Sequence, residues 1–301
     1  MAADALTAFA EEVGTPCRGP VCVVGGRTQW DIGGSVARGA REVRAPQGVV
    51  SFEPAEMTVR VRAATTVADL DDALAEAGQT VAMPSWPGAT VGGVLAVGHS
   101  GVFRLGYGPV RDTLLEARVV TAEGRLVKAG GPTVKNVSGY DLCRLLVGSL
   151  GTLGFVAEVV LRTRPRPAVS RWFAGPADPF ALHGRLHRPA ALLWDGATTW
   201  LCLEGHPDDV DAEAGLAGLG PADGPPPLPP HRRSLQPAAL RDLPGRQEPF
   251  VAEVGVGVVH GPDLSPGPSL DPPVAELHRR VKAAFDPTSR LNPGRRPELG
   301  S

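Results

Sequence analysis

Three glycine-rich segments contain the residues of this sequence that could bind a phosphorylated ligand. They are Val23-Val24-Gly25-Gly26-Arg27-Thr28, Pro87-Gly88-Ala89-Thr90-Val91-Gly92-Gly93 and Gly148-Ser149-Leu150-Gly151-Thr152-Leu153-Gly154. Glycine lets the backbone adopt a positive φ and has no Cβ to obstruct a ligand, so successive N–H groups can point at a pyrophosphate. Together the segments predict one extended dinucleotide site.

The two common nucleotide motifs are absent from the sequence. It has no G-x-x-x-x-G-K-[ST] and no G-x-G-x-x-G that opens a helix after a strand, which argues against the P-loop and Rossmann folds. A single Gly-Gly pair is more often an ordinary turn. The setting favours a cofactor site, because the apolar run from Val21 to Val24 predicts a buried strand that delivers the first loop, and Thr28 offers a hydroxyl.

Composition indicates a folded protein of two domains. The chain has 301 residues, of which 43% are hydrophobic and 21% charged. The net charge of −2 gives no reason to expect nucleic acid or an anionic membrane as partner. No run approaches the roughly 20 apolar residues of a membrane span, and the N-terminus lacks the positive start of a signal peptide. We therefore expect a cytoplasmic location.

The cysteines predict no metal site. Cys17, Cys22, Cys143 and Cys202 are scattered without a C-x-x-C pair, so a zinc or iron-sulfur site built from this chain alone is not expected. Buried free thiols are the simpler interpretation.

Hydrophobic periodicity predicts alternating helices and strands in the first part of the chain. Thr66 followed by Asp69 is typical of a capping-box helix start, and Gly78 ends that helix. Two runs around Ala122-Glu123-Gly124 predict a β-hairpin. The predicted helices are 4–13 and 66–77, and the predicted strands are 21–24, 48–52, 58–63, 114–120, 125–128 and 155–163.

Arg164-Pro165-Arg166-Pro167 breaks this pattern and predicts a domain boundary. Beyond it the proline-rich segment 220–230 is expected to be extended and exposed. The remaining predicted elements are strands 192–194, 199–203 and 251–259 and a helix over 274–285.

Five motifs together resemble the FAD-binding proteins of the vanillyl-alcohol oxidase and p-cresol methylhydroxylase (PCMH) type. These are the three glycine segments, Tyr107-Gly108-Pro109-Val110-Arg111-Asp112, and the tail Leu291-Asn292-Pro293-Gly294. Within that family, Lys135-Asn136-Val137-Ser138-Gly139-Tyr140-Asp141 is similar to a hallmark of the FAD-binding subunit of bacterial glycolate oxidase.

The resemblance implies an α+β fold. It predicts a PCMH-type FAD-binding domain over 1–167, with subdomains of about 1–50 and 51–167. A small, reduced cap or substrate domain would follow over 168–285, and the C-terminal tail 286–301 would return to the FAD domain.

The same resemblance implies the cofactor-binding residues. The first loop would lie along the FAD pyrophosphate, the second would close over it, and Val156 would use its backbone near the adenine. The implied set is Val24, Gly25, Gly26, Arg27, Thr28, Gln29, Pro87, Gly88, Thr90, Gly92, Gly93, Arg111, Asp112, Gly139, Tyr140, Gly151, Gly154, Val156 and Asn292.

Two departures from the family pattern concern the cofactor. Arg27 stands where many relatives have a third glycine, which would bring a positive charge beside the phosphates. No histidine occurs between Gly25 and Gly34, where covalent-flavin relatives carry one, so we expect non-covalent FAD. We also expect valine at Gly92 and Gly93 to abolish FAD retention, because a Cβ would intrude where backbone meets phosphate.

Catalytic residues are poorly defined by the sequence. His99 follows the second loop, and His260 ends a predicted strand, where a histidine is more often structural. No His-x-x-x-Gly-Asp-Gly-Asn-x-His-like signature of the catalytic glycolate-oxidising subunit occurs between residues 168 and 285. Tyr140 and Arg111 are expected to brace the cleft, and Trp30 and Trp86 either stack on the flavin or pack beneath the loops.

The resemblance implies three alternative functions. The chain is an FAD-binding oxidoreductase component that oxidises a small 2-hydroxy acid with a catalytic flavin subunit and an iron-sulfur subunit, which could hold it at the inner membrane. Alternatively it is a non-catalytic accessory subunit that stabilises a flavoprotein partner, or an autonomous FAD-linked oxidase. A cell-wall-precursor reductase shares this fold but has a substrate domain that is not recognisable here.

Overall fold

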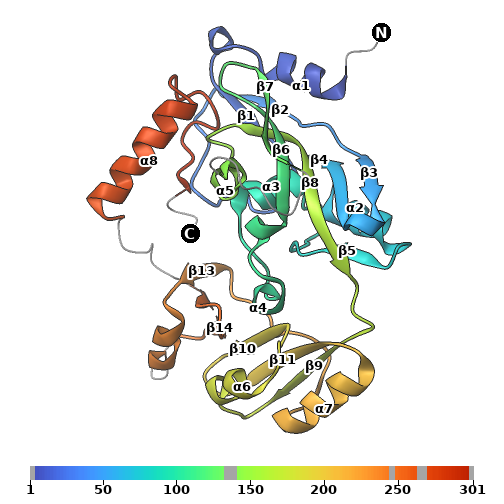
Figure 1. The fold of residues 1–301 in the computed structure, drawn as a ribbon. Coiled ribbons are helices and arrows are strands. Elements are labelled where there is room, and N and C mark those ends of the chain that lie inside the picture. The colour runs from blue at the N-terminus through green and yellow to red at the C-terminus, as the bar shows by residue number, and fades with distance from the viewer. Residues whose placement is uncertain (1–3, 132–140, 244–247, 263–269, 298–301) are drawn as a thin grey trace. The chain divides into compact units, whose positions relative to one another are not determined.

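The computed structural model describes residues 4–131, 141–243, 248–262 and 270–297, which form an α+β fold (Figure 1). The chain divides into two compact units, each built from separate segments. The first comprises Met1–His99, Pro109–Pro165 and Pro268–Ser301, and the second comprises Ser100–Gly108 and Arg166–Gly267. Helix α8 therefore groups with the first unit, whereas the sequence prediction assigned it to the second domain.

A six-stranded sheet is the centre of the first unit as far as it is described. Its strands run in the order β3-β4-β8-β6-β7, and β5 pairs with β8. β6 and β7 are antiparallel neighbours, which confirms the predicted hairpin. The strands are β3 (Val49–Glu53), β4 (Thr58–Arg62), β5 (Gln79–Val81), β6 (Leu114–Val120), β7 (Leu126–Gly130) and β8 (Phe155–Pro165).

Period-2 alternation separates the two faces of this sheet. On β4, Val59 and Val61 are buried in the core, while Arg60 points to the opposite face. There its Nη1 lies 3.0 Å from Oε1 of Glu116 and 3.1 Å from Oε1 of Glu158. These two carboxylates are buried and need the guanidinium, because an unpaired buried charge is costly.

Three helices cover the apolar face: α2 (Val67–Ala75), α3 (Val91–Val97) and α5 (Leu142–Leu146). The hydroxyl of Thr66 accepts a hydrogen bond of 3.0 Å from the Asp69 N–H, so the predicted start of α2 is confirmed. Thr90 caps α3 in the same way through the Gly93 N–H at 3.2 Å.

A second apolar cluster joins the two ends of the chain. Helix α1 (Ala5–Val13), predicted over 4–13, packs with the parallel pair β1 (Val21–Val23) and β2 (Arg41–Val43). Leu291, from the tail that follows α8 (Pro272–Phe285), is fully buried in this cluster. Short 3₁₀ turns at Pro16–Arg18, Pro54–Glu56 and Val110–Thr113 complete the described elements of the unit.

The guanidinium of Arg290 holds this junction together. It donates hydrogen bonds to the backbone carbonyls of Val13 (2.8 Å), Gly14 (2.9 Å), Gly19 (3.0 Å) and Ala122 (2.9 Å). Burial lowers the pKa of the side chain, and nearby arginines act in the same direction. The cation is therefore stabilised mainly by carbonyl oxygens in a site of reduced solvent access.

The second unit is a seven-stranded sheet in the order β12-β9-β11-β10-β14-β15-β13, counted over the described residues. Helices α6 and α7 and a 3₁₀ turn at Pro237–Asp242 contribute to its core (Figure 1). The elements are α4 (Arg104–Tyr107), β9 (Val169–Gly175), α6 (Pro179–Arg185), β10 (Ala191–Trp194), β11 (Thr199–Gly205), α7 (Pro207–Ala217), β12 (Gly220–Ala222), β13 (His231–Ser234), β14 (Val251–Glu253) and β15 (Val258–Gly261).

One expectation for this unit needs correction. The predicted strand 251–259 is two antiparallel strands, β14 and β15, because the chain turns at Gly255 (φ +81°) and Gly257 (φ +85°). The proline-rich segment 220–230 has no buried residue, as predicted, and its extended start, β12, pairs with β9 as an edge strand. Proline is tolerated there because an edge strand leaves one side of its backbone unpaired.

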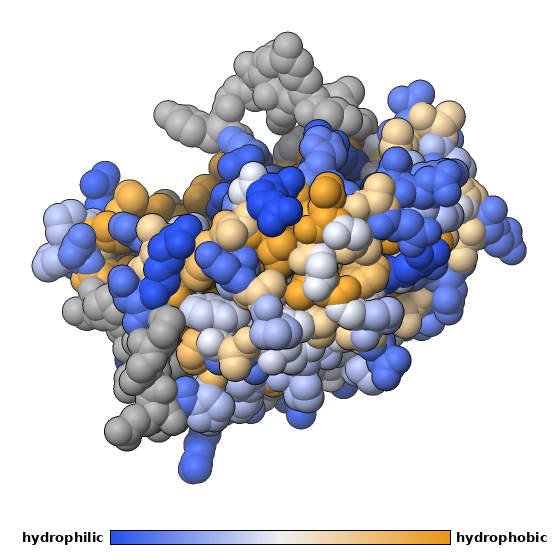
Figure 2. Space-filling view, turned by 90° about the horizontal axis from the view of Figure 1, so that it is seen from below, coloured by the Kyte–Doolittle hydropathy of each residue, from blue (hydrophilic) through white to orange (hydrophobic). Residues whose placement is uncertain are grey.

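None of the helices within the described ranges has the length and apolar character needed to cross a bilayer. On the face shown in Figure 2, hydrophilic side chains are interspersed with apolar ones.

The Arg290 contacts give a stability prediction. Arg290→Met should lower the free energy of unfolding by about 3 kcal/mol or more, because buried carbonyls lose their donors. Urea unfolding measures this loss. Arg296→Met, at an exposed neighbouring position, is the control and should stay within about 0.5 kcal/mol of wild type. Equal stabilities for the two variants would contradict the role of Arg290.

The cysteines give a reactivity prediction. Cys17 is exposed and the other three are buried. Burial raises the pKa of Cys143 to about 11 and that of Cys202 to about 12, and it also raises the pKa of Cys22. Because the thiolate is the reactive form, a thiol reagent at pH 8 should modify Cys17 rapidly and the others only after unfolding. Rapid modification of a second thiol in the folded protein would refute this assignment.

Candidate functional site

The first glycine loop leaves its backbone donors unused. The Val24 N–H donates to the Val43 carbonyl at 2.9 Å, but the N–H groups from Gly25 to Trp30 donate no hydrogen bond to any residue in the described ranges. The loop is partly to fully exposed, so these donors are accessible. Successive free N–H groups form a concave site suited to an anion.

The second loop uses its glycine amides differently. The Gly92 N–H donates to the Ala63 carbonyl at 2.8 Å, and the Gly93 N–H donates to the Thr90 hydroxyl. A Cβ at Gly92 would lie 2.8 Å from the Ala63 Cβ and 3.0 Å from its carbonyl oxygen. Valine there would thus collide with protein, which differs from the collision with phosphate that we expected.

The two loops touch each other through Gly26. A Cβ on Gly26 would lie 1.7 Å from the carbonyl oxygen of Gly88, and a Cβ on Gly25 would lie 2.5 Å from the Thr90 hydroxyl. Only glycine allows such a close approach of two backbones. This contact sets the width of the gap between the loops.

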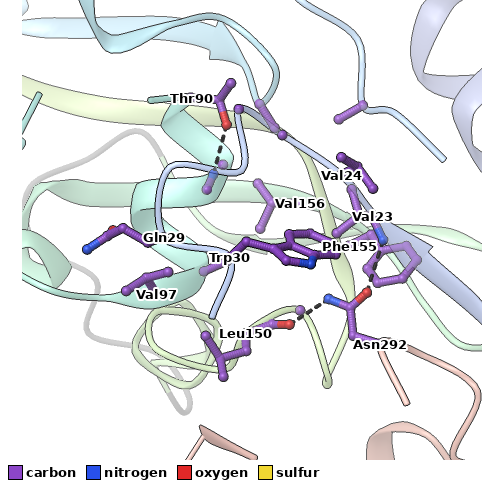
Figure 3. Close-up of a pocket in the computed structure, with 18 of the residues that line it drawn as sticks. Val23, Val24, Gln29, Trp30, Thr90, Val97, Leu150, Phe155, Val156 and Asn292 are labelled. Atoms are coloured by element: carbon purple, nitrogen blue, oxygen red, sulfur yellow. Dashed lines mark hydrogen bonds between the residues drawn. The ribbon is translucent and has the colours of Figure 1, made fainter. Parts of the chain in front are cut away.

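Asn292 connects the first loop to the third glycine segment. Its Nδ2 donates to the Leu150 carbonyl at 2.6 Å, and its Oδ1 accepts from the Val23 N–H at 3.0 Å, as the dashed lines in Figure 3 show. The residue has a φ of +42°, which asparagine tolerates better than most side chains. Its amide therefore has a positioning role in this structure.

These segments enclose a cleft within the first unit (Figure 3). It contains about 910 Å³ of space, part of it open to solvent. Thirteen of the cofactor residues implied by the resemblance line it, namely Val24, Gly25, Gly26, Arg27, Thr28, Gln29, Thr90, Gly92, Gly93, Gly151, Gly154, Val156 and Asn292.

The other implied residues lie elsewhere. Pro87 and Gly88 are outside the lining, although Gly88 supports the first loop through Gly26. Arg111 and Asp112 are half-exposed and belong to a surface ion-pair chain in which Arg144 bridges Asp112 and Asp141. Gly139 and Tyr140, with most of the Lys135–Asp141 hallmark, lie outside the described residues.

Neither catalytic candidate lines the cleft. His99 is buried beside helix α3 and is not part of the lining. His260 belongs to the second unit, where its Nε2 lies 2.8 Å from Oε1 of buried Glu253. Oε2 of Glu253 has no hydrogen-bond partner among the described residues.

Sequence reasoning missed most of the apolar lining and one cation. Alanines 45, 63, 64 and 96 leave room for a ligand, and nothing in their local sequence distinguishes them from core alanines. Arg295 lines the cleft from the tail, three residues after Asn292. Arg295 directly follows the tail motif Leu291-Asn292-Pro293-Gly294, and that position was a usable signal. Trp30, considered as a stacking residue, also lines the cleft.

The chain is similar in sequence to a protein family and to several known proteins. Residues 7–130 match the FAD binding domain family. The chain is 32% identical to glycolate oxidase subunit GlcE of Escherichia coli (strain K12) over 218 residues, which cover 66% of this chain and 60% of GlcE. It is 43% identical to D-lactate dehydrogenase of Archaeoglobus fulgidus over 107 residues, which cover 35% of this chain and 24% of that dehydrogenase. Glycolate oxidase subunit GlcD of Bacillus subtilis is 41% identical over 83 residues, which cover 28% of this chain and 18% of GlcD.

These matches span at most 60% of the three relatives. Among solved structures, an alkyldihydroxyacetonephosphate synthase matches with a TM-score of 0.68 at 14% identity. The match covers 96% of this chain and 73% of the synthase chain. At this identity the likeness shows the fold alone.

The Gly26 contact gives a binding prediction. Gly26→Ala should push the first loop away from Gly88, since its Cβ would overlap the carbonyl oxygen, and FAD retention should fall at least tenfold. The flavin-to-protein absorbance ratio after reconstitution measures this. Gly131→Ala is the control, because no atom of the described residues lies within 4 Å of a Cβ placed there. Normal FAD content in Gly26→Ala would show that this contact does not shape the site.

Proposed function

We propose that the chain is the FAD-binding component of an enzyme that oxidises a small 2-hydroxy acid and passes the electrons to partner subunits. The match of residues 7–130 to the FAD binding domain family supports the cofactor. Two of the relatives are named for glycolate oxidase and D-lactate dehydrogenase, and glycolate and D-lactate are both 2-hydroxy acids.

The cleft fits FAD. The free N–H groups of Gly25 to Trp30 match the acceptor oxygens of a diphosphate, and the glycine and alanine lining lets a flat ring system approach the backbone. When bound, FAD supplies hydride and electron transfer, and the protein supplies binding and orientation. We propose that the cofactor is held non-covalently.

The observation that supports a role as one component of a larger enzyme is the set of side chains that line the cleft. In the described part of the chain, the cleft is lined by no histidine, tyrosine, lysine, cysteine or carboxylate. A hydroxy acid must lose its hydroxyl proton during oxidation, so a proton acceptor is needed close to the substrate. We propose that another subunit supplies it.

Two alternatives remain testable. The GlcE match favours an accessory subunit that stabilises a catalytic flavoprotein, because that relative is itself named as one subunit of glycolate oxidase. The buried Glu253–His260 pair of the second unit favours an autonomous oxidase, since it is a proton-accepting group within this chain.

The proposed partners are a catalytic flavin subunit and an iron-sulfur subunit. The similarity to both GlcE and GlcD supports assembly with a related flavoprotein. We propose that the complex is cytoplasmic and is held at the inner membrane by its partners.

Anaerobic titration with glycolate and D-lactate tests the function. The FAD-loaded chain, alone and copurified with the products of neighbouring genes, is followed by flavin absorbance, with L-lactate as the enantiomer control. We expect bleaching only in the presence of the partners. Bleaching of the isolated chain would establish an autonomous dehydrogenase, and an unbleached flavin in the full complex would overturn 2-hydroxy-acid oxidation.

A further inference from the structure

Two cations from opposite ends of the sequence lie over one aromatic ring in the cleft. The Cζ atom of Arg27 is 5.0 Å from the ring centroid of Trp30, and that of Arg295 is 4.5 Å from it. All three residues line the cleft. A guanidinium within about 6 Å of a tryptophan ring is attracted by the ring's quadrupole, so Trp30 holds each of the two charges beside its ring.

Arg27 has an unfavourable backbone conformation. Its φ of +56° lies in the left-handed region, which glycine adopts at lower cost. Such strain costs about 1 kcal/mol or more and is characteristic of functional sites. The side chain is half-exposed and pairs with Oε1 of Glu42 through Nη2 at 2.5 Å, while its Nε and Nη1 donate no hydrogen bond to the described residues.

Arg295 is a cation without a carboxylate partner in the described ranges. Its Nη1 donates to the Ile32 carbonyl at 2.9 Å and to that of Gly34. Partial burial lowers the pKa of the guanidinium, and Asp31 opposes that shift without forming an ion pair. Its Nε and Nη2 donate no hydrogen bond to any described residue. The positive charge is thus held in place by backbone carbonyls, and no carboxylate in the described ranges forms an ion pair with it.

We propose that Arg27 and Arg295, held on Trp30, form a two-cation clamp for the diphosphate of FAD, in addition to the backbone N–H groups of the first loop. The inference rests on FAD binding as proposed above. A diphosphate carries two negative charges, and two guanidinium groups with unused donors match it in charge and in hydrogen-bonding chemistry. The clamp also explains why an arginine occupies a left-handed position. The backbone conformation lowers the stability of the fold, and the side chain strengthens the binding of the cofactor.

Glu42 competes with the ligand for Arg27. The carboxylate is half-exposed and pairs with the guanidinium in this structure. A diphosphate that approaches Arg27 must share it with Glu42, so the proposal predicts that removal of this carboxylate strengthens binding. A purely structural role for Arg27 predicts no such gain.

The test measures FAD affinity by quenching of flavin fluorescence at low and high salt, with ADP as a competitor that carries a diphosphate but no flavin. Arg27→Gly and Arg295→Gln should each weaken FAD and ADP binding about tenfold at low salt, and the difference from wild type should shrink at high salt, as expected for an electrostatic contribution. Glu42→Gln should tighten binding about threefold. Arg296→Gln, at an exposed position next to Arg295, is the matched control and should bind FAD as wild type does.

Two further readouts separate binding from folding. Arg27→Gly relieves backbone strain, so its Tm should equal or exceed that of wild type although FAD binds more weakly. Arg295→Lys keeps the charge but loses the planar donor fork, so its FAD affinity should lie between those of wild type and Arg295→Gln. Affinities of Arg27→Gly and Arg295→Gln within twofold of wild type, or losses that are the same at every salt concentration, would overturn the clamp. Failure of wild type itself to bind FAD would instead refute the proposed function.

Discussion

The contact on which the cleft depends is the return of the C-terminal tail to strand β1. The Val21 N–H donates to the Arg290 carbonyl and the Asn292 N–H donates to the Val21 carbonyl, each at 2.9 Å, so the tail has a single register beside the strand. In this register the side chain of Arg290 donates a hydrogen bond to the Val13 carbonyl, and that of Asn292 donates one to the Leu150 carbonyl. Because buried polar groups must be paired, a shift of the tail by one residue would leave several of them without partners.

The first and second glycine loops differ in how they use their backbone N–H groups. The second loop uses its amides within the protein, on Ala63 and Thr90, and acts as a support. The first loop is supported at Gly26 and keeps its own amides for a ligand. Glycine is required in both loops, but in the second it permits close packing of protein on protein, and in the first it also permits approach of a cofactor.

The charged side chains of the chain's two compact units differ in character. The described lining of the cleft in the first unit carries positive charge at Arg27 and Arg295 and includes no carboxylate or histidine. The Glu253–His260 pair belongs to the second compact unit.

The sequence by itself determined the local features. Alternation predicted β4, an apolar run predicted β8, and the two runs around Ala122-Glu123-Gly124 predicted the hairpin of β6 and β7. The Thr66–Asp69 pair predicted the start of α2, and the glycine segments identified half of the cleft lining. Each of these predictions depends on residues that are neighbours in the chain. Prediction was less successful where glycine reversed the chain within an apolar run, as between β14 and β15.

Tertiary structure alone decided how distant segments share the site. Val23 and Asn292 are joined although they are 269 positions apart, and Arg295 meets Trp30 across a similar span. It also decided that Gly92 faces Ala63 and that the compact units are built from separate segments. The physical reason is that these contacts arise from the packing of two chain ends on one strand, and such packing leaves no periodicity or spacing in either segment alone.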